Sequence, residues 1–389
     1  MTVVKRKICV VITARPSYAR IKTALEAIAK RPDLELQLVI AASALLERYG
    51  RIIEILRADG FEPTATVYML VEGENLVTSA KSTGLGIVEL ATIFDNLAPD
   101  IVLTIADRYE TIATAIAASY LNIPVAHVQG GEVTGSIDEK VRHAVTKFAN
   151  YHFVSNDTSG ERVKRMGEDP ATVFVTGCPS IDLASRILDE PDQPLDVLKT
   201  PGGQGVGHPF DLSQPFLVVL QHSVPTEFAG AAQQVTETME AILELKVPTF
   251  WFWPNVDAGS DATSKTIRQF RERDPLDNIY FLKNLPPEEF LRLLKSSVGI
   301  VGNSSVAIRE CSYMGVPAVN IGTRQSRRER GPNVIDVDHD RKAVADAVRK
   351  QLAHGRYPRS RVYGDGTAGR QIADLLATVE LQINKQIAY

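Results

Sequence analysis

Short apolar runs alternate with longer helical segments along most of the chain, and this alternation restricts the fold more than any other feature. In the first half, runs typical of strands include Lys7–Thr13, Leu34–Ala42, Asp100–Ala106 and Pro124–Val128. The alanine-rich segment Glu110–Leu121, between the last two runs, is typical of a helix. A strand, a helix and a second strand in this order form a βαβ unit with parallel strands. The sequence therefore predicts an α/β protein with doubly wound sheets.

A stretch rich in proline and glycine interrupts this alternation between Asp189 and Gln214. Its glycines do not follow a strand, as those of a phosphate-binding loop should, so we expect a linker or surface loop. A second series of strands starts at Phe216–Leu220. The expected parts are a Rossmann-like domain over residues 1–190, a second one over residues 212–365, and a C-terminal helix within residues 366–389 that packs back on the first domain. Two such domains facing a cleft are the architecture of the GT-B fold.

Composition narrows the class of protein. The chain has 389 residues, 44% of them hydrophobic and 23% charged, as in a soluble globular protein of two domains. A net charge of −4 argues against binding to nucleic acid or to an anionic membrane surface. From the sequence we expect no signal peptide, and we find no run of the ~18 apolar residues that a membrane span needs. Three scattered cysteines then predict a cytoplasmic protein, and seven histidines without metal-ligand spacing predict no metal.

Carboxylates gather in the first domain where two predicted strands end. Asp107 directly follows one strand, and Glu132 follows the next strand in the loop Gln129–Glu132. Because parallel strands send their carboxyl ends to one edge of a sheet, these loops should meet, and we favour Asp107 as a functional acid.

A predicted helix that starts at Ile137 carries more charged residues. Ser136 and Glu139 have the spacing of a capping box, and Glu139 can also touch His143 one turn later. Asp138 lies in the first turn, where it is either an ion-pair partner of Arg142 or a catalytic acid. Both interpretations stay open.

Residues suited to bind an anion follow strands in both domains. In the first domain, Arg15 lies in a strand-to-helix turn without a glycine-rich dinucleotide motif. In the second domain, Gly302-Asn303-Ser304-Ser305 lies between a strand and a helix expected to begin near Ser305, with Glu310 placed to reach a ribose. The side chains that follow neighbouring strands there are His222, Asn255 and Arg324. This pattern favours a nucleotide-diphosphate site and an enzyme acting on a nucleotide sugar.

Several motifs together resemble a known family over nearly the whole chain. The motifs are Asp107-Arg108, Gly130-Gly131-Glu132-Val133-Thr134-Gly135-Ser136-Ile137-Asp138-Glu139 with Arg142-His143, Gln221-His222, Trp253-Pro254-Asn255, Gly302-Asn303-Ser304-Ser305 with Arg309-Glu310, and Gly322-Thr323-Arg324-Gln325. In this order they resemble the hydrolysing UDP-N-acetylglucosamine 2-epimerases of sialic-acid and related nonulosonic-acid biosynthesis. The resemblance implies a GT-B fold, a UDP-sugar substrate, no cofactor, and a homodimer or homotetramer.

The resemblance also implies roles for individual residues. Ser304, Ser305, His222 and Arg324 would hold the diphosphate, Glu310 the ribose, and Asn255 would line the nucleotide pocket. Arg15 and Arg108 would meet the diphosphate from the first domain, where His143 also belongs to the substrate site. Asp107 and Asp138 would be acid and base residues while UDP leaves, a glycal forms, and water adds to give N-acetylmannosamine. Our own hypothesis is that Glu132 shares this work with them.

The chain departs from the family pattern at three places. Arg15-Pro16-Ser17-Tyr18-Ala19 stands where the family usually has Arg-Ala-Asp-Tyr-Ser, and Ala106 replaces a glycine. Gln129 stands where many members have a glutamate, and glutamine cannot transfer a proton at neutral pH. We expect Glu132 to substitute for it, or Gln129 to orient water or the acetamide group.

Alternative functions follow from the same residues. One is hydrolysis and epimerisation of a UDP-2,4-diacetamido-2,4,6-trideoxyhexose, as in legionaminic-type pathways. Another is a GT-B glycosyltransferase, which would need an acceptor. A third, suggested by Gln129, is a catalytically inactive UDP-sugar-binding sensor.

Overall fold

The computed structural model divides the chain into two compact units, each built on its own sheet. It describes residues 4–46, 52–73, 76–105, 108–134, 137–191, 197, 199–200, 203–207, 210–254, 260–273 and 276–388. Unit 1 comprises residues 1–132, 137–183 and 363–389, and unit 2 comprises residues 133–136 and 184–362. The sequence predicted boundaries at residues 190 and 366. It did not predict that the short segment 133–136 would cluster with unit 2.

Unit 1 is a parallel sheet of seven strands within its described residues, in the order β3-β2-β1-β4-β5-β6-β7. The strands are β1 (Arg6–Ile12), β2 (Leu34–Ala41), β3 (Ala65–Val67), β4 (Ile101–Ile105), β5 (Val125–Val128), β6 (Tyr151–Val154) and β7 (Val173–Val175). The helices are α1 (Arg15–Lys30), α2 (Ile52–Ala58), α3 (Leu76–Leu97), α4 (Thr111–Tyr120), α5 (Ile137–Phe148), α6 (Asp157–Arg165), α7 (Pro179–Asp189, which runs on into unit 2) and α13 (Ala368–Thr378), with 3₁₀ turns η1 (Ala42–Leu45) and η3 (Pro170–Thr172).

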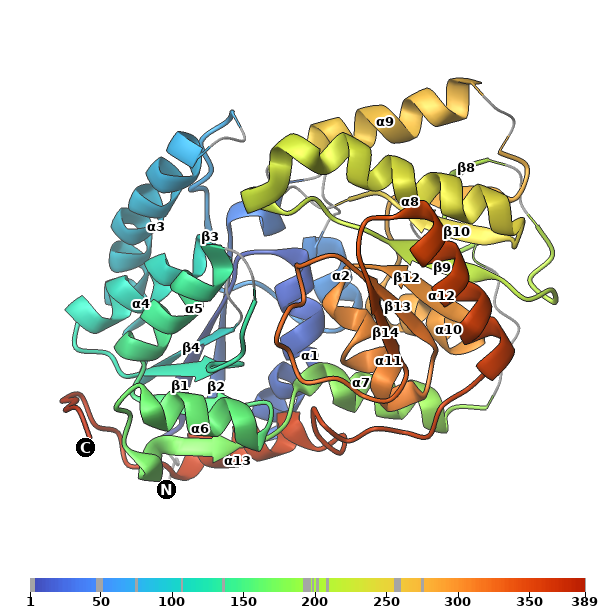
Figure 1. The fold of residues 1–389 in the computed structure, drawn as a ribbon. Helices are drawn as coiled ribbons and strands as arrows, with labels where there is room; N and C mark the ends of the chain where they lie inside the picture. Colours follow the sequence, from blue (N-terminus) through green and yellow to red (C-terminus); the bar gives the residue numbers. More distant parts are fainter. Residues whose placement is uncertain are drawn as a thin grey trace. The chain divides into compact units, whose positions relative to one another are not determined.

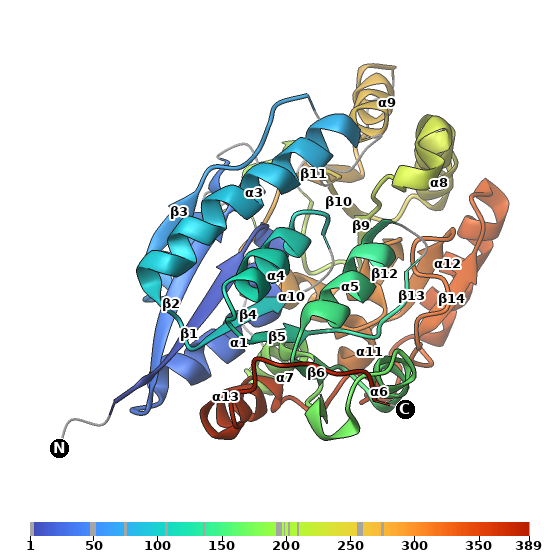
Figure 2. The same ribbon diagram turned by 90° about the vertical axis from the view of Figure 1, so that its left-hand side faces the viewer.

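Helices cover both faces of this sheet (Figures 1 and 2). On one face, α1, α2 and α13 pack their apolar side chains, including Ile21, Leu56 and Ile372, against the strands. On the other face, α3 and α4 pack through Leu90, Phe94 and other apolar residues. Because the strands are buried on both faces, they are apolar without alternation, which made them recognisable in the sequence.

Unit 2 repeats this plan with the strand order β14-β13-β12-β9-β10-β11-β8 among its described residues. The strands are β8 (Val206–Gly207), β9 (Leu217–Leu220), β10 (Thr249–Phe252), β11 (Ile279–Leu282), β12 (Gly299–Gly302), β13 (Ala318–Ile321) and β14 (Val334–Val337). The helices are α8 (Ala231–Leu245), α9 (Ser260–Arg273), α10 (Pro287–Ser296), α11 (Glu310–Met314) and α12 (Arg341–His354), with 3₁₀ turns η4 (Pro225–Gly230) and η5 (Ser305–Ala307). One face packs on α8, α9 and α12 through residues such as Met239, Ile267 and Val348.

Part of the proline- and glycine-rich stretch differs from its predicted role. Val206 and Gly207 form β8, which pairs antiparallel with Phe281 and Tyr280 of β11 at the edge of the sheet. A Cβ on Gly205 would lie 2.1 Å from the carbonyl oxygen of Phe281, so only glycine allows this approach. A two-residue strand held by backbone bonds has no apolar pattern, and the sequence could not reveal it.

Within the described residues, no helix combines the length and the apolar character that a membrane crossing needs. The cytoplasmic location expected from the sequence stays a prediction.

Candidate functional site

Glu132 is a buried carboxylate in the loop that follows β5. Its residue is only 1% exposed. Ser155 Oγ donates a hydrogen bond of 2.7 Å to Glu132 Oε1. Arg142 Nη1, also buried, donates to the main-chain carbonyl of Glu132 at 2.8 Å. Both the side chain and the backbone of Glu132 are therefore fixed by unit 1.

The loop before Glu132 requires unusual backbone angles. Gln129 and Gly131 have φ of 68° and 73°, in the left-handed region. A Cβ on Gly131 would lie 2.2 Å from the carbonyl oxygen of Ser159, so no larger residue fits there. Gln129 Nε2 donates to Cys178 Sγ at 2.9 Å. The glutamine that departs from the family pattern is thus tied to Cys178, and its expected role toward water or an acetamide stays untested.

Helix α5 begins at Ile137, as predicted, and presents Asp138 and Glu139 in its first turn. His143 Nε2 lies 3.5 Å from Glu139 Oε1, which confirms that this pair touches. Burial and the positive charge of Arg142 lower the pKa of His143, whereas Glu139 raises it. His143 is therefore biased toward its neutral form at physiological pH. Ser136, the predicted capping residue, lies outside the described residues.

Other predicted residues of unit 1 are described only in part. Asp107 lies outside the described residues, as does Ala106. Arg15 was expected in a strand-to-helix turn but is the first residue of α1, and its side chain also lies outside the described part. Arg108 follows β4 and forms an ion pair of 2.9 Å, through its Nε, with Oε1 of the buried Glu110. Of the group expected to meet the diphosphate from unit 1, only Arg108 can be placed.

In unit 2, Asn303 connects the loops that follow three strands. Its side chain accepts from the main-chain N–H of His222 at 2.8 Å and donates to the carbonyl of His222 at 2.7 Å. Its main-chain carbonyl accepts from Arg324 Nη1 at 3.2 Å and from Gln325 Nε2 at 2.9 Å. His222, the Asn303–Ser305 turn and Arg324 are therefore brought together at the carboxyl edge of this sheet, as the sequence predicted for neighbouring strands.

A second brace supports the Arg324 loop. Thr323 Oγ1 donates to Glu227 Oε1, and Gln234 Nε2 donates to Glu227 Oε2 at 2.8 Å. His339 lies behind the loop, where a Cβ on Gly322 would be 2.3 Å from its Nε2. The position of Arg324 thus depends on residues for which the sequence predicted no role.

The helix expected near Ser305 is interrupted, which corrects the prediction. Ser305–Ala307 form the 3₁₀ turn η5, capped by Ser304, whose Oγ accepts from Val306 N at 3.4 Å. The α-helix α11 begins only at Glu310. Glu310 is 9% exposed, and its Oε2 is buried without a hydrogen-bond partner in the described part of the chain. Such an acceptor is ready to bind a donor such as a sugar hydroxyl. Asn255 lies outside the described residues.

Titratable side chains in the described residues form no group of three or more His, Cys, Asp or Glu that could hold a metal ion. The cationic and hydrogen-bonding groups at the edge of the unit 2 sheet suit an anion instead. In unit 1, the buried Glu132 and the first turn of α5 supply carboxylates, a kind of group that can exchange protons with a ligand.

The model of the family described as UDP-N-acetylglucosamine 2-epimerase matches residues 26–377. The chain belongs to this family. The protein is therefore an enzyme of the UDP-sugar 2-epimerase type, which confirms the resemblance stated above.

Three known proteins illustrate the relationship. The chain is 32% identical to a Legionella pneumophila "UDP-N,N'-diacetylbacillosamine 2-epimerase (hydrolyzing)", covering 99% of this chain and 100% of the relative. It is 27% identical to a Neisseria meningitidis "UDP-N-acetylglucosamine 2-epimerase", covering 97% and 96%. The structure of S. aureus MnaA with UDP has a TM-score of 0.78 at 17% identity, covering 99% and 100%. The last likeness concerns the fold alone and confirms the predicted GT-B-like fold of two α/β domains.

Proposed function

We propose that this 2-epimerase is of the hydrolysing type and releases UDP and a free 2-epimeric amino sugar. The observation that carries the proposal is the 32% identity, over the full length of both chains, to a relative described as hydrolysing. The described site agrees with it. Groups suited to bind an anion lie together in unit 2. Carboxylates lie in unit 1, in segments that belong to the family motifs of the sequence.

We assign UDP to the carboxyl edge of the unit 2 sheet. Ser304, Ser305, His222 and Arg324 would hold the diphosphate, and Glu310 Oε2 would accept from the ribose hydroxyls. Asn303 supports this assignment because its backbone and side chain hold His222 and Arg324 in fixed positions. Arg15, Arg108, His143 and Asn255 remain proposed substrate residues.

The proposed chemistry moves one ring proton. A carboxylate removes the proton on carbon 2 while the bond between carbon 1 and the diphosphate oxygen breaks, so that UDP leaves and a glycal forms. Water then adds to carbon 1, and a proton is delivered to the other face of carbon 2. Cationic and hydrogen-bonding groups stabilise the departing diphosphate.

We assign these proton transfers to Asp107, Glu132 and Asp138. The substitution E132Q tests Glu132, to which we assign a role because Gln129 cannot transfer a proton. Turnover should fall by at least a hundredfold. If E132Q leaves turnover unchanged while D107N abolishes it, the assignment to Glu132 is wrong.

For the sugar, we favour a UDP-2,4-diacetamido-2,4,6-trideoxyhexose, because the 32% identical relative is described as acting on UDP-N,N'-diacetylbacillosamine. UDP-N-acetylglucosamine, the substrate predicted from the sequence, is the second candidate and is favoured by the Neisseria relative. Initial rates of UDP release from each sugar decide between them. A kcat/KM at least tenfold higher for the diacetamido sugar supports the first candidate, and the reverse ratio supports the second. Since family membership makes the protein an enzyme, the inactive-sensor alternative is dropped.

A homodimer, one of the two assemblies that the family resemblance implies beside a homotetramer, has a candidate surface on α3. Val77 and Val88 of this helix are 63% and 65% exposed and lie three turns apart, on the side opposite the buried Leu90. Lys81 and Glu89 are exposed nearby, so an antiparallel α3 of a second copy would place opposite charges together. V88D should convert a dimer into a monomer in light-scattering measurements, whereas V4D, at another exposed valine, should not. A monomeric wild type would contradict this assignment.

A further inference from the structure

Ser155 lies where β6 ends and α6 is about to begin. Its neighbour Asn156 caps α6, because Asn156 Oδ1 accepts from Ser159 N at 2.9 Å. On the other side, β6 pairs with β5 from Tyr151 to Phe153, and Phe153 O accepts from Gln129 N at 2.9 Å. The backbone of Ser155 is thus held between a strand and a capped helix, beside the loop that carries Glu132.

The hydroxyl of Ser155 donates a hydrogen bond to a buried carboxylate, that of Glu132. Ser155 and Glu132 are each 1% exposed, and the 2.7 Å bond from Ser155 Oγ to Glu132 Oε1 has the usual length for a hydroxyl donor. A buried carboxylate is costly unless donors satisfy it, and a donor that faces its ionised form favours that form. The same bond also limits the orientations that the carboxylate can adopt.

We propose that Ser155 is a positioning residue, which orients the Glu132 carboxylate and keeps it ionised for proton transfer on the substrate. This inference rests on the proposed role of Glu132. Ser155 itself does not exchange a proton with the sugar. Its effect on the reaction passes entirely through Glu132.

Other cationic or titratable groups near the loop of Glu132 come from three elements. Arg142 on α5 donates to the Glu132 carbonyl, and it is followed by His143, which contacts Glu139. Arg162 on α6 donates to the carbonyl of Gly131 at 3.3 Å. His127 on β5 packs beside Gly130. The substitution S155A removes none of these side chains, so we expect a shift in the pH dependence of the variant to report the lost hydroxyl.

The test compares S155A with S159A. Ser159 is the matched control: it is a fully buried serine four residues later, and its Oγ has no hydrogen-bond partner among the described residues. We expect the acidic limb of log(kcat/KM) against pH to move to higher pH by about one unit in S155A, because the carboxylate protonates more readily without the donor. S159A should keep the wild-type profile. UDP affinity, measured by calorimetry, should stay within twofold of the wild type in both variants.

Each other outcome has a definite meaning. If S155A lowers the melting temperature but leaves the acidic limb in place, Ser155 is only structural and the inference is wrong. If S155A does not fold, S155C, with a weaker donor of similar size, should show a smaller shift in the same direction, and an unmoved limb there also overturns the inference. If E132Q retains full turnover, the proposed role of Glu132 fails instead, which separates the two claims.

Discussion

Glu310 is a buried acid at the start of α11, beside Cys311 and one residue after the buried Arg309. Burial and the charge of Glu310 raise the pKa of the Cys311 thiol well above its usual value, so the thiol stays protonated. One carboxylate oxygen, Oε2, lacks a hydrogen-bond partner in the described residues. An unsatisfied buried acceptor is destabilising in the free protein and is satisfied when a ligand supplies a donor.

Removing this carboxylate should therefore weaken nucleotide binding. For E310A we expect the Kd for UDP to rise about tenfold, the loss of one hydrogen bond to a charged group. Isothermal titration calorimetry with UDP measures it. E272A, at an exposed glutamate of α9, should bind UDP like the wild type. A Kd for E310A within twofold of the wild type would remove Glu310 from the UDP site.

The sequence located single residues well where a motif surrounds them and poorly where it does not. Glu132, His222 and Arg324 follow predicted strands, and the described structure places each in the loop after such a strand, whereas Glu310 begins α11. Ser155 escaped notice because a lone serine after a strand has no distinctive pattern. Its partner is 23 residues away in sequence and reaches it only once β5 and β6 are paired.

At the scale of elements, α13 belongs to unit 1 and packs on α1. Asp182 of α7 holds its first turn: Oδ1 accepts from Ala368 N at 2.9 Å, and Oδ2 accepts from Gly369 N at 2.6 Å. A Cβ on Gly369 would lie 2.6 Å from the main-chain carbon of Thr23, so the glycine allows the two helices to approach closely. A buried carboxylate that accepts from the first N–H groups of a helix stabilises the folded protein.

We expect D182A to lower the free energy of unfolding by about 2–4 kcal/mol, because two buried N–H groups lose their acceptor. Urea denaturation followed by circular dichroism measures this change. D365A removes an exposed bond to Thr367 N and should cost only about 0.5–1 kcal/mol. Equal effects of the two substitutions would contradict the capping role of Asp182.

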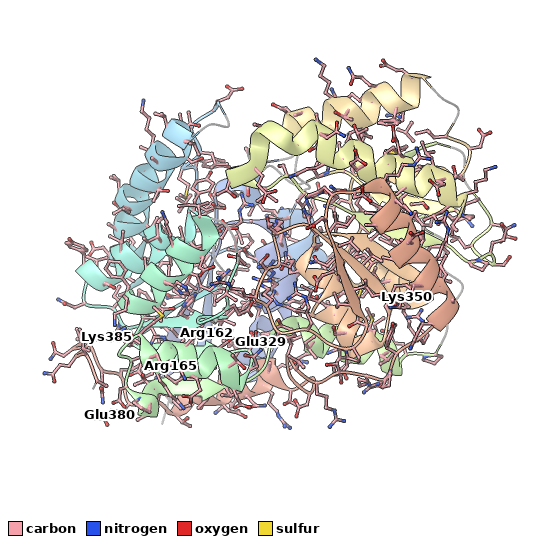
Figure 3. All side chains as sticks on the ribbon, in the orientation of Figure 1. Arg162, Arg165, Glu329, Lys350, Glu380 and Lys385 are labelled. Atoms are coloured by element: carbon pink, nitrogen blue, oxygen red, sulfur yellow. The ribbon has the colours of Figure 1, made fainter. Side chains whose placement is uncertain are left out.

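The segment after α13 is held by a cluster of charged side chains. The buried Glu168 accepts from Lys147 Nζ at 2.7 Å and lies 3.0 Å from His152 Nε2 and 2.5 Å from Lys385 Nζ. Figure 3 labels Lys385 and Glu380 on this segment. Lys385 Nζ also donates to the last carbonyls of α5, those of Thr146 and Lys147. The C-terminal segment therefore supports the far end of the helix that carries Asp138 and His143.

This cluster makes the stability of unit 1 dependent on pH. Burial raises the pKa of Glu168, but hydrogen bonds from His152, Lys147 and Lys385 outweigh it and hold the pKa at about 2, below the ordinary 4.5. The stabilisation is therefore complete above pH 4.5 and is lost as the pH falls toward 2. E168Q should lower the free energy of unfolding by about 2–3 kcal/mol at pH 7. At pH 3, the difference in free energy of unfolding between E168Q and the wild type should be about 2 kcal/mol smaller than at pH 7.

Urea denaturation at pH 7, 5 and 3 tests this expectation. E161Q is the control, since Glu161 on α6 pairs with Lys164 at an exposed site. It should follow the wild type at every pH. If the difference in free energy of unfolding between E168Q and the wild type stays constant from pH 7 to pH 3, the cluster does not titrate as described.

At the scale of the whole molecule, the two-sheet plan was predictable because strands buried on both faces give continuous apolar runs. The antiparallel β8 and the interruption between η5 and α11 were not predictable. In each case the deciding contacts are made by backbone groups or by residues distant in the sequence. The place of residues 133–136 in unit 2 was also not predictable. Arg328 Nε donates to the carbonyl of Val133 at 3.0 Å, and these two residues are far apart in the sequence.

The most direct test of the account follows the hydrogen on carbon 2. The purified enzyme is incubated in D₂O with the UDP-sugar that it turns over fastest, and products are followed by proton NMR. We predict one UDP released for each sugar consumed, and a free 2-epimeric amino sugar that carries deuterium at carbon 2. A product that retains UDP, or a free sugar that keeps its original hydrogen at carbon 2, would contradict hydrolytic epimerisation through a glycal.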